Sequence, residues 1–199
     1  FNTLNMIASM AQVEDAATTE QMITAMSRLF RYNLKSTDSV MPLERELKVV
    51  SDYMYLQQMR FGKRLRFTSD CPADTLDYLV PSFALQPLVE NAIYHGMEFM
   101  DGDGEILIKA WRDGDDLYMS VGDNGLGMTQ EQVENLFAAA EHVPSRRGSG
   151  IGVRNVNERI KLYFGKEYGL VIDSEPDEGT TVTAHLPAVP YDQVAQKVT

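Results

Sequence analysis

Two adjacent polar residues interrupt an apolar stretch, "LQPLVENAIYHG", that runs from residue 85 to residue 96. The side-chain carbonyl oxygen of Asn91 is a hard ligand of the kind that Mg²⁺ accepts while it keeps waters and phosphate oxygens in its shell. Glu90 could polarise a proton or hold the water shell of such an ion. Because adjacent helical positions point about 100° apart, the two side chains cannot both face one ion directly. We therefore expect Asn91 to contact the metal, and Glu90 to act through water or a partner helix.

A second motif, "DNGLGM", occupies residues 123–128 and follows an alternating segment. The carboxylate of Asp123 can accept a hydrogen bond from an exocyclic amine, which favours an adenine edge over a guanine carbonyl. Gly125 and Gly127 carry no Cβ, so the backbone there can approach a flat ring. These features predict an adenine pocket at the end of a strand.

A third motif, "GSGIG" at 148–152, opens a segment with helical spacing. Its glycines, Gly148, Gly150 and Gly152, expose backbone N–H groups at a helix N-terminus, where the positive end of the helix dipole favours a polyphosphate. Each motif alone is weak evidence, because short glycine-rich stretches are common in turns. Together and in this order, the three motifs predict a site for a nucleotide and its metal ion.

The first 62 residues have a helical pattern. Apolar residues recur there near the 3.6-residue period, with no strand signal, so they need to bury against each other or against a second copy of the chain. Thr18 or Thr19 predicts a helix start, "STDS" at 36–39 a break, and Pro42 the first turn of the next helix. We therefore expect a helical hairpin in this region.

After Gly62 the pattern changes to mixed α and β structure. Alternating segments predict strands, two of them joined by a turn at Asp113 and Gly114, and two longer apolar-periodic segments predict helices. The strand segments are 64–70, 104–112, 115–123, 169–175 and 179–187, and the helical ones are 81–96 and 153–165. Strands linked mostly as hairpins and alternating with helices indicate an α+β fold, a two-layer α/β sandwich preceded by the helical hairpin.

Composition narrows the classes of partner. The chain has 18 Lys and Arg against 29 Asp and Glu, a net charge of −11, which argues against general binding of nucleic acid. A single cysteine, Cys71, excludes an internal disulfide. No apolar run reaches the roughly 18 residues of a membrane span. The first residues start in mid-pattern without a Met, so we expect a part of a longer protein whose membrane segments, if present, lie upstream.

The ordered motifs resemble a known family. "VENAIYHG", "DNGLGM", "GSGIG" and the terminal "GTTVTAHLP" are similar to the boxes of the GHKL, or Bergerat-fold, ATP-binding domain. "FNTLNMIASM", "LERELKVVSDYMYLQQMRFG" and "VPSFALQPLVENAIYHG" resemble the LytS/YehU type of bacterial sensor histidine kinase, and this resemblance spans essentially the whole chain. It implies a helical dimerisation and phosphoacceptor-type region over 1–62, an ATP-binding catalytic domain over 63–190 and a tail over 191–199.

The resemblance also implies roles for single residues. It places Mg²⁺ on Asn91, adenine on Asp123 with Met128 beside it, and phosphate on the glycines around Ile151, with the hydroxyl of Thr180 or a water supporting Asp123. Two positions depart from the wider family. Pro87 stands where hydrolysing relatives have a glutamate that activates water, and Tyr94 stands where many kinases have a lysine. We expect His95, or the loop residues Arg146 and Arg147, to supply the missing positive charge, so that Arg146→Ala weakens ATP binding.

The function expected from the resemblance is that of a two-component sensor kinase. It would bind ATP and Mg²⁺ and pass the γ-phosphoryl to a histidine just before Phe1, then to an aspartate of a response regulator, so these 199 residues alone would not autophosphorylate. A second kinase protomer is the expected partner, and the location is the cytoplasmic side of a plasma-membrane protein. Two alternatives remain open: an anti-sigma-type serine kinase, which lacks the long preceding helices, and an ATP-binding switch without catalysis.

Overall fold

The computed structural model describes residues 2–35, 39–96, 102–138 and 151–192. The α-helices of this part of the chain are α1 (Asn2–Val13), α2 (Ala17–Lys35), α3 (Leu43–Phe61), α4 (Leu85–Gly96), α5 (Gln130–Ala138) and α6 (Ile151–Phe164). The strands are β1 (Val40–Pro42), β2 (Leu65–Asp70), β3 (Leu79–Pro81), β4 (Gly104–Asp113), β5 (Asp116–Asp123), β6 (Gly169–Glu175) and β7 (Gly179–Pro187). Short 3₁₀ turns lie at Gly62–Arg64 and Ala73–Thr75.

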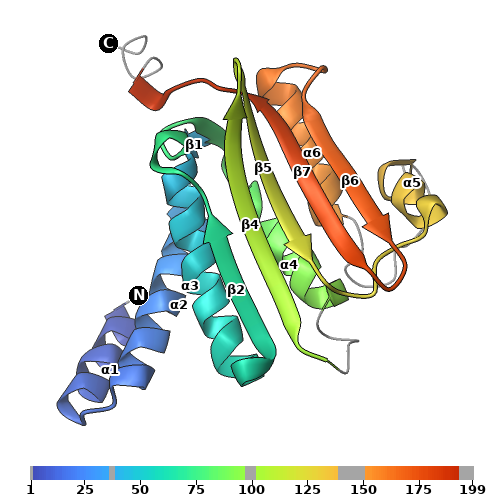
Figure 1. The fold of residues 1–199 in the computed structure, drawn as a ribbon. Helices are drawn as coiled ribbons and strands as arrows, with labels where there is room; N and C mark the ends of the chain where they lie inside the picture. Colours follow the sequence, from blue (N-terminus) through green and yellow to red (C-terminus); the bar gives the residue numbers. More distant parts are fainter. Residues whose placement is uncertain (1, 36–38, 97–101, 139–150, 193–199) are drawn as a thin grey trace.

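The main sheet has five strands in the order β2-β4-β5-β7-β6. Strand β2 is parallel to β4, and all other neighbours in this sheet are antiparallel. Helices α4 and α6 cover one face of the sheet and α3 lies beside β2, while α1 and α2 extend away from it as a hairpin (Figure 1). This arrangement confirms the predicted two-layer α/β sandwich preceded by a helical hairpin.

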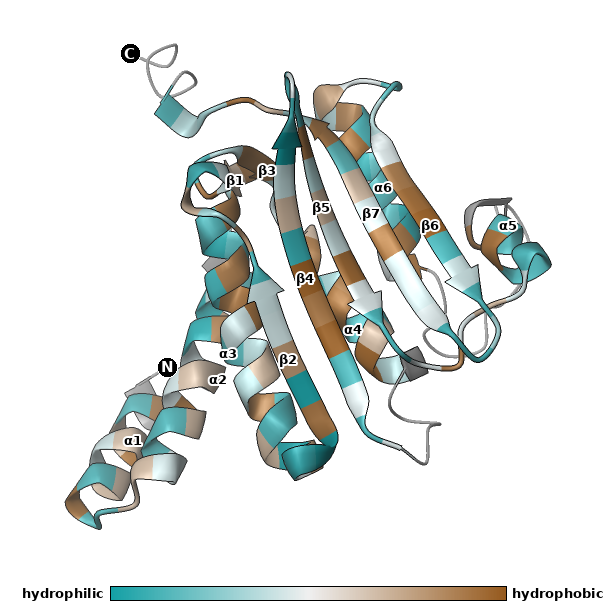
Figure 2. Cartoon of the chain, viewed as in Figure 1, coloured by the Kyte–Doolittle hydropathy of each residue, from teal (hydrophilic) through white to brown (hydrophobic). Residues whose placement is uncertain are grey.

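The β4–β5 hairpin shows why the sequence folds this way. Ile106, Ile108 and Ala110 are buried at alternate positions of β4, and the residues between them are more exposed. The middle of β4 is nevertheless continuously hydrophobic in Figure 2, because Leu107 between the two isoleucines is also apolar. Asp113 pairs with Asp116, so the loop holds two residues, and Gly114 adopts the positive φ of 59° that such tight turns require. The predicted tight turn is therefore present, but one residue later, at Gly114 and Asp115, because Asp113 still belongs to β4.

Helix α4 begins later than predicted. The sequence pattern favoured a helix from Pro81, but Pro81 ends the short strand β3, which pairs with β1, and the helix starts at Leu85. Phe83 has a φ of +61°, a left-handed conformation that no residue of a right-handed helix adopts. The sequence signal failed because an apolar run does not reveal this backbone turn.

Helix α3 packs into the core together with the sheet. Its residues Leu43, Val50 and Met54 are buried in the same hydrophobic cluster as the inner faces of α4 and β4. On its other side α3 contacts α2, through an ion pair of 2.5 Å between Arg28 and Asp52 among other contacts. The domain boundary near residue 62 stays a prediction, and α3 structurally links the two parts that it would separate.

Candidate functional site

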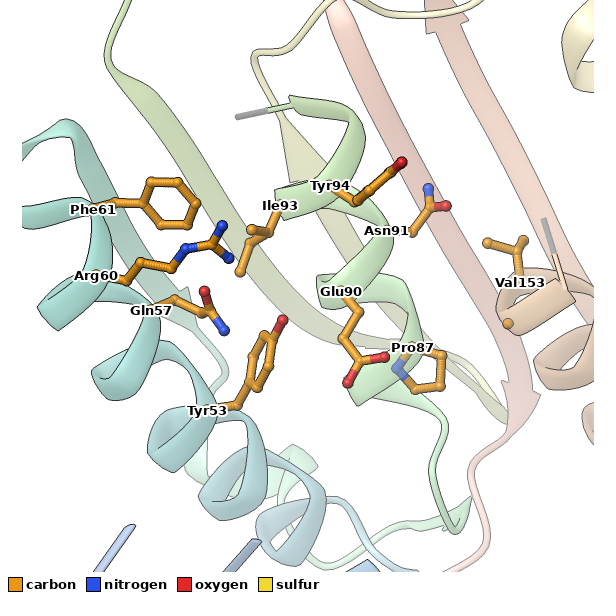
Figure 3. Close-up of a pocket in the computed structure, with 11 residues that line it drawn as sticks. Tyr53, Gln57, Arg60, Phe61, Pro87, Glu90, Asn91, Ile93, Tyr94 and Val153 are labelled. Carbon is orange, nitrogen blue, oxygen red and sulfur yellow. The ribbon is translucent and has the colours of Figure 1, made fainter. Parts of the chain in front are cut away.

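A cavity of about 330 Å³ lies along the outer side of α4, between α3 and the start of α6 (Figure 3). Helix α4 contributes Glu90, Asn91 and Tyr94 to its lining, and α6 contributes Gly152 and Val153. Pro87 and Ile93 of α4 also line the cavity, while Leu85, Leu88, Val89 and Ala92 are buried in the core. The motif "LQPLVENAIYHG" therefore forms one wall of a cavity with its polar side and packs on the sheet with its apolar side, as the spacing predicted.

The two adjacent polar residues of α4 point in different directions. Asn91 is half-buried and lies on the side of α4 that faces Val153 at the start of α6, whereas Glu90 is exposed (Figure 3). The carboxylate of Glu90 accepts a hydrogen bond of 2.8 Å from Nε2 of Gln86, one helical turn earlier. The geometry thus leaves Asn91 as the amide next to α6 and places Glu90 on the side nearer α3.

Asp123 lies at the end of β5, where it is half-buried. Its Oδ1 accepts a hydrogen bond of 2.9 Å from the backbone N–H of Gly125, and the backbone N–H of Thr180 also stabilises the carboxylate. Burial raises the pKa of Asp123 to about 6, and the two N–H groups oppose this rise. At neutral pH the side chain is therefore mainly an ionised acceptor, held in place by the backbone around it.

The hydroxyl of Thr180 makes a different contact from the predicted one. Its Oγ1 lies 2.8 Å from Oγ of Ser174 on β6, while the contact with Asp123 comes from the backbone of Thr180. The Ser174 hydroxyl also accepts the backbone N–H of Met128 at 2.8 Å and donates to the carbonyl of Gly179 at 3.0 Å. Ser174 therefore fixes the "DNGLGM" loop to β6 and β7. The sequence analysis missed this residue because nothing local distinguishes it from other strand serines.

Two glycines of the motifs are required by close contacts within the protein. Gly127 has a φ of +62°, and a Cβ at this position would overlap the backbone carbonyl of Glu175. A Cβ on Gly152 would lie 3.2 Å from Cβ of Pro87, where α4 and α6 touch. Both glycines therefore bring backbones together, a role that the sequence analysis did not separate from an approach to a ligand.

Comparison with known proteins identifies the family. Residues 81–190 match the family described as histidine kinase-, DNA gyrase B-, and HSP90-like ATPase, and residues 1–65 match the family described as histidine kinase. The chain belongs to the histidine kinase-, DNA gyrase B- and HSP90-like ATPases. Within this ATPase family, the match over residues 1–65 and the relatives described next confirm the resemblance to sensor histidine kinases of the LytS type.

Relatives of this ATPase-family chain are sensor kinases. It is 32% identical over 187 residues to the sensor histidine kinase BtsS of Escherichia coli (strain K12), 34% identical over 188 residues to the sensor protein LytS of Staphylococcus saprophyticus, and 33% identical over 187 residues to the sensor histidine kinase YesM of Bacillus subtilis. Each match covers 94% of this chain and 31% of the relative. The chain therefore spans about a third of the length of these relatives.

Solved structures of low sequence identity share the fold of this ATPase-family chain. The catalytic domain of histidine kinase ThkA matches with a TM-score of 0.53 and 20% identity, over 74% of this chain and 91% of that one. The mycobacterial sensor histidine kinase MprB matches with a TM-score of 0.54 and 17% identity, over 73% and 95%. Along the described ranges, none of the helices combines the length and apolarity needed to cross a bilayer.

Only some of the remaining predicted site residues lie in the described part of this ATPase-family chain. Ile151 is exposed and begins α6, next to the cavity. His95 lies on α4, but its side chain is outside the described part of the structure. The loop residues Arg146, Arg147, Gly148 and Gly150 also lie outside the described residues. The predicted phosphate-binding turn is thus represented here only by its last two residues.

The residues present fit a nucleotide with a magnesium ion. No group of three or more His, Cys, Asp or Glu side chains that could hold a metal ion occurs in the described part of this ATPase-family chain. A protein-only metal cage is not what Mg²⁺ beside a polyphosphate needs, because that ion takes most of its ligands from water and phosphate oxygens. The half-buried amide of Asn91, on the wall of a cavity, is a ligand of the suitable type.

Proposed function

We propose that this chain is the ATP-binding and catalytic part of a sensor histidine kinase of a two-component system. The observation that carries the proposal is the carboxylate of Asp123, half-buried, fixed by two backbone N–H groups and ionised at neutral pH, in a chain of the histidine kinase-like ATPases. A fixed acceptor of this kind suits the exocyclic amine of adenine. Burying a carboxylate costs free energy, and a bound amine would offset part of that cost.

The proposed roles are divided between the residues that line the cavity and the loop at the end of β5, which does not line it. Asp123 accepts the adenine amine, with Gly125, Gly127 and Met128 forming the adjoining loop. Asn91 offers its amide oxygen to Mg²⁺, which when bound neutralises charge on the phosphates. Glu90 orders water or a proton near the transferred group, and the backbone N–H groups at the start of α6, together with the preceding glycines, bind phosphate.

Pro87 supports phosphoryl transfer to a protein group over hydrolysis of ATP. Its side chain can neither accept nor donate a proton, and in the structure it packs against Gly152 where a water-activating carboxylate would otherwise stand. The γ-phosphoryl then passes to a histidine and from there to an aspartate of a response regulator. We further propose that the whole protein acts as a homodimer and is held at the membrane by segments upstream of these residues, with this part on the cytoplasmic side.

Calorimetric titration of the 199-residue chain with ATP, with and without Mg²⁺, tests the binding step. Asn91→Ala should remove the gain in affinity that Mg²⁺ provides, because the ion loses its protein ligand, whereas Asn33→Ala, an exposed amide on α2, should leave it unchanged. A wild-type chain that binds neither ATP nor ADP would contradict the proposal.

The transfer step is tested on a protein that includes the expected acceptor segment before Phe1. Incubation with γ-labelled ATP should give a label that is lost in acid and kept in base, as a phosphohistidine is. Absence of label on dimeric, ATP-bound protein would instead favour an ATP-binding switch.

A further inference from the structure

The cavity has a second wall that the sequence motifs did not indicate. Tyr53, Gln57 and Arg60 of α3, spaced four and three residues apart on one helical face, line the same cavity as Asn91 and Gly152. In Figure 3 all three side chains extend from α3 toward α4. The cavity is thus bounded by α3, α4 and α6. The roles proposed above involve residues of α4 and α6 but none of α3.

The wall formed by α3 differs from the other two walls of the cavity because it carries a positive charge. Of the eleven residues that line the cavity, all within the described part of the chain, Arg60 is the single cation and Glu90 the single anion. A triphosphate brought into a protein of net charge −11 requires local positive charge. Tyr94, on the opposite wall, is the neutral residue at the position where the resemblance implied a lysine.

The field of Arg60 reaches into the cavity. Burial is the main cause that raises the pKa of Tyr53 to about 12; the charge of Glu90 raises it further, and the charge of Arg60 lowers it. The phenol of Tyr53 therefore lies within range of both charges. The guanidinium of Arg60 lies 4.8 Å from the centre of the Phe61 ring, a cation–π contact between two residues of the cavity lining.

We propose that α3 forms part of the nucleotide site and that Arg60 binds the terminal phosphate of ATP, with Gln57 and Tyr53 donating hydrogen bonds beside it. This inference rests on the proposed function. It places the γ-phosphate at the α3 side of the cavity, whereas Asp123, the proposed adenine acceptor, lies outside the cavity lining.

The position of α3 makes this placement useful for transfer. Helix α3 packs between α4 and α2, and it is tied to α2 by the Arg28–Asp52 ion pair and by a hydrogen bond of 3.0 Å from Tyr55 to Gln21. A γ-phosphate held by α3 therefore lies on the side of the catalytic part that faces the helical hairpin (Figure 1). That is the side from which an acceptor carried by the hairpin would approach.

The test compares the affinities of adenosine, ADP and ATP, each with Mg²⁺, in the wild-type chain, Arg60→Ala and Arg60→Lys. Because hydrogen bonds to a charged group are among the strong ones, Arg60→Ala should weaken ATP binding by about 10- to 100-fold and ADP binding much less, with adenosine unchanged. Arg60→Lys keeps the charge and should recover part of the loss. The matched control is Arg66→Ala. It removes an exposed arginine of β2 that forms an ion pair of 3.0 Å with Glu105.

Each other outcome is informative. Equal loss for ATP and ADP would overturn the assignment to the terminal phosphate, and equal loss for all three ligands would show that Arg60 only supports the fold. Unchanged ATP affinity in Arg60→Ala, with normal binding by the wild type, would overturn this inference and leave the proposed function standing. Absence of ADP and ATP binding by the wild type would instead refute the proposed function itself.

Discussion

Asp123 should make stability and ligand binding depend on pH in opposite directions. Its pKa lies at about 6 in the folded chain against an ordinary value of 3.8, because burial disfavours the ionised form. A group whose pKa is raised by folding contributes stability that is fully present below the unfolded pKa and is lost as the pH rises through the folded one. The unliganded protein should therefore lose stability between about pH 4 and pH 7, while the ionised acceptor that adenine needs becomes available.

The size of both effects follows from the same shift. The difference between 3.8 and about 6 corresponds to a limit of about 3 kcal/mol at 1.36 kcal/mol for each tenfold step in proton affinity. Since Asp123 keeps some contact with solvent, we expect about 1–2 kcal/mol. If only the ionised form binds adenine, about a tenth of the protein is competent at pH 5 and nearly all at pH 7.5, which predicts an affinity roughly tenfold higher at the upper pH.

The assay compares the wild type with Asp123→Asn, which cannot titrate. Urea unfolding at pH 4.5, 6 and 7.5 gives the stability difference between the two chains, so contributions from other titrating groups cancel. Adenosine is the ligand of choice, followed by NMR titration, because it carries no titrating phosphate. The reasoning is refuted if the stability difference stays constant across this range, or if wild-type affinity for adenosine falls as the pH rises.

Two further predictions concern the framework around the site. Glu46→Ala should lower the free energy of unfolding by about 3–5 kcal/mol, because the fully buried Glu46 carboxylate accepts the backbone N–H of Leu85 at 3.0 Å and the hydroxyl of Tyr32, and both donors lose this acceptor, whereas the N–H of Phe83 keeps the Tyr32 oxygen at 2.9 Å. Glu44→Ala, on the exposed side of the same helix, should cost less than about 1 kcal/mol, and a similar small loss at Glu46 in urea unfolding would contradict the assignment. Gly127→Ala should destabilise the chain by more than about 1 kcal/mol and weaken adenosine binding, because its Cβ has no space; thermal unfolding and adenosine titration equal to the wild type would show that the loop can move aside.

Much of the fold could be predicted because its signals are local. The alternation of β4 and β5 and the two-residue turn at Gly114 can be read from neighbouring residues, and so can the start of α3 after Pro42. The start of α4 could not. It depends on the left-handed Phe83 and on the carboxylate of Glu46, which lies 39 residues before Leu85 and satisfies the first N–H groups of the helix.

The candidate site shows the same division between local and distant information. Asn91 and Asp123 stand out in the sequence because their motifs are short and each carries its own chemistry, and their roles stay predictions. Ser174 and Arg60 do not stand out, because neither belongs to a motif and each reaches the site only through the packing of its strand or helix. The prediction for the hydroxyl of Thr180 differed from the structure for a related reason: its partner is set by the neighbouring strand.

Helix α4 carries the cavity wall, and its position is determined from both sides by residues distant in sequence. At its start, buried Glu46 receives the first backbone N–H groups and also the hydroxyl of Tyr32 from α2. The ring of Tyr32 lies 4.5 Å from that of Phe83 at an angle of 50°, and the Phe83 ring also lies 5.8 Å from the guanidinium of Arg159 on α6. A movement of α2 therefore acts on the same short segment that sets where α4 begins. Since Asn91 lies less than two turns further along α4, continuous side-chain contacts connect the helical hairpin with the candidate site.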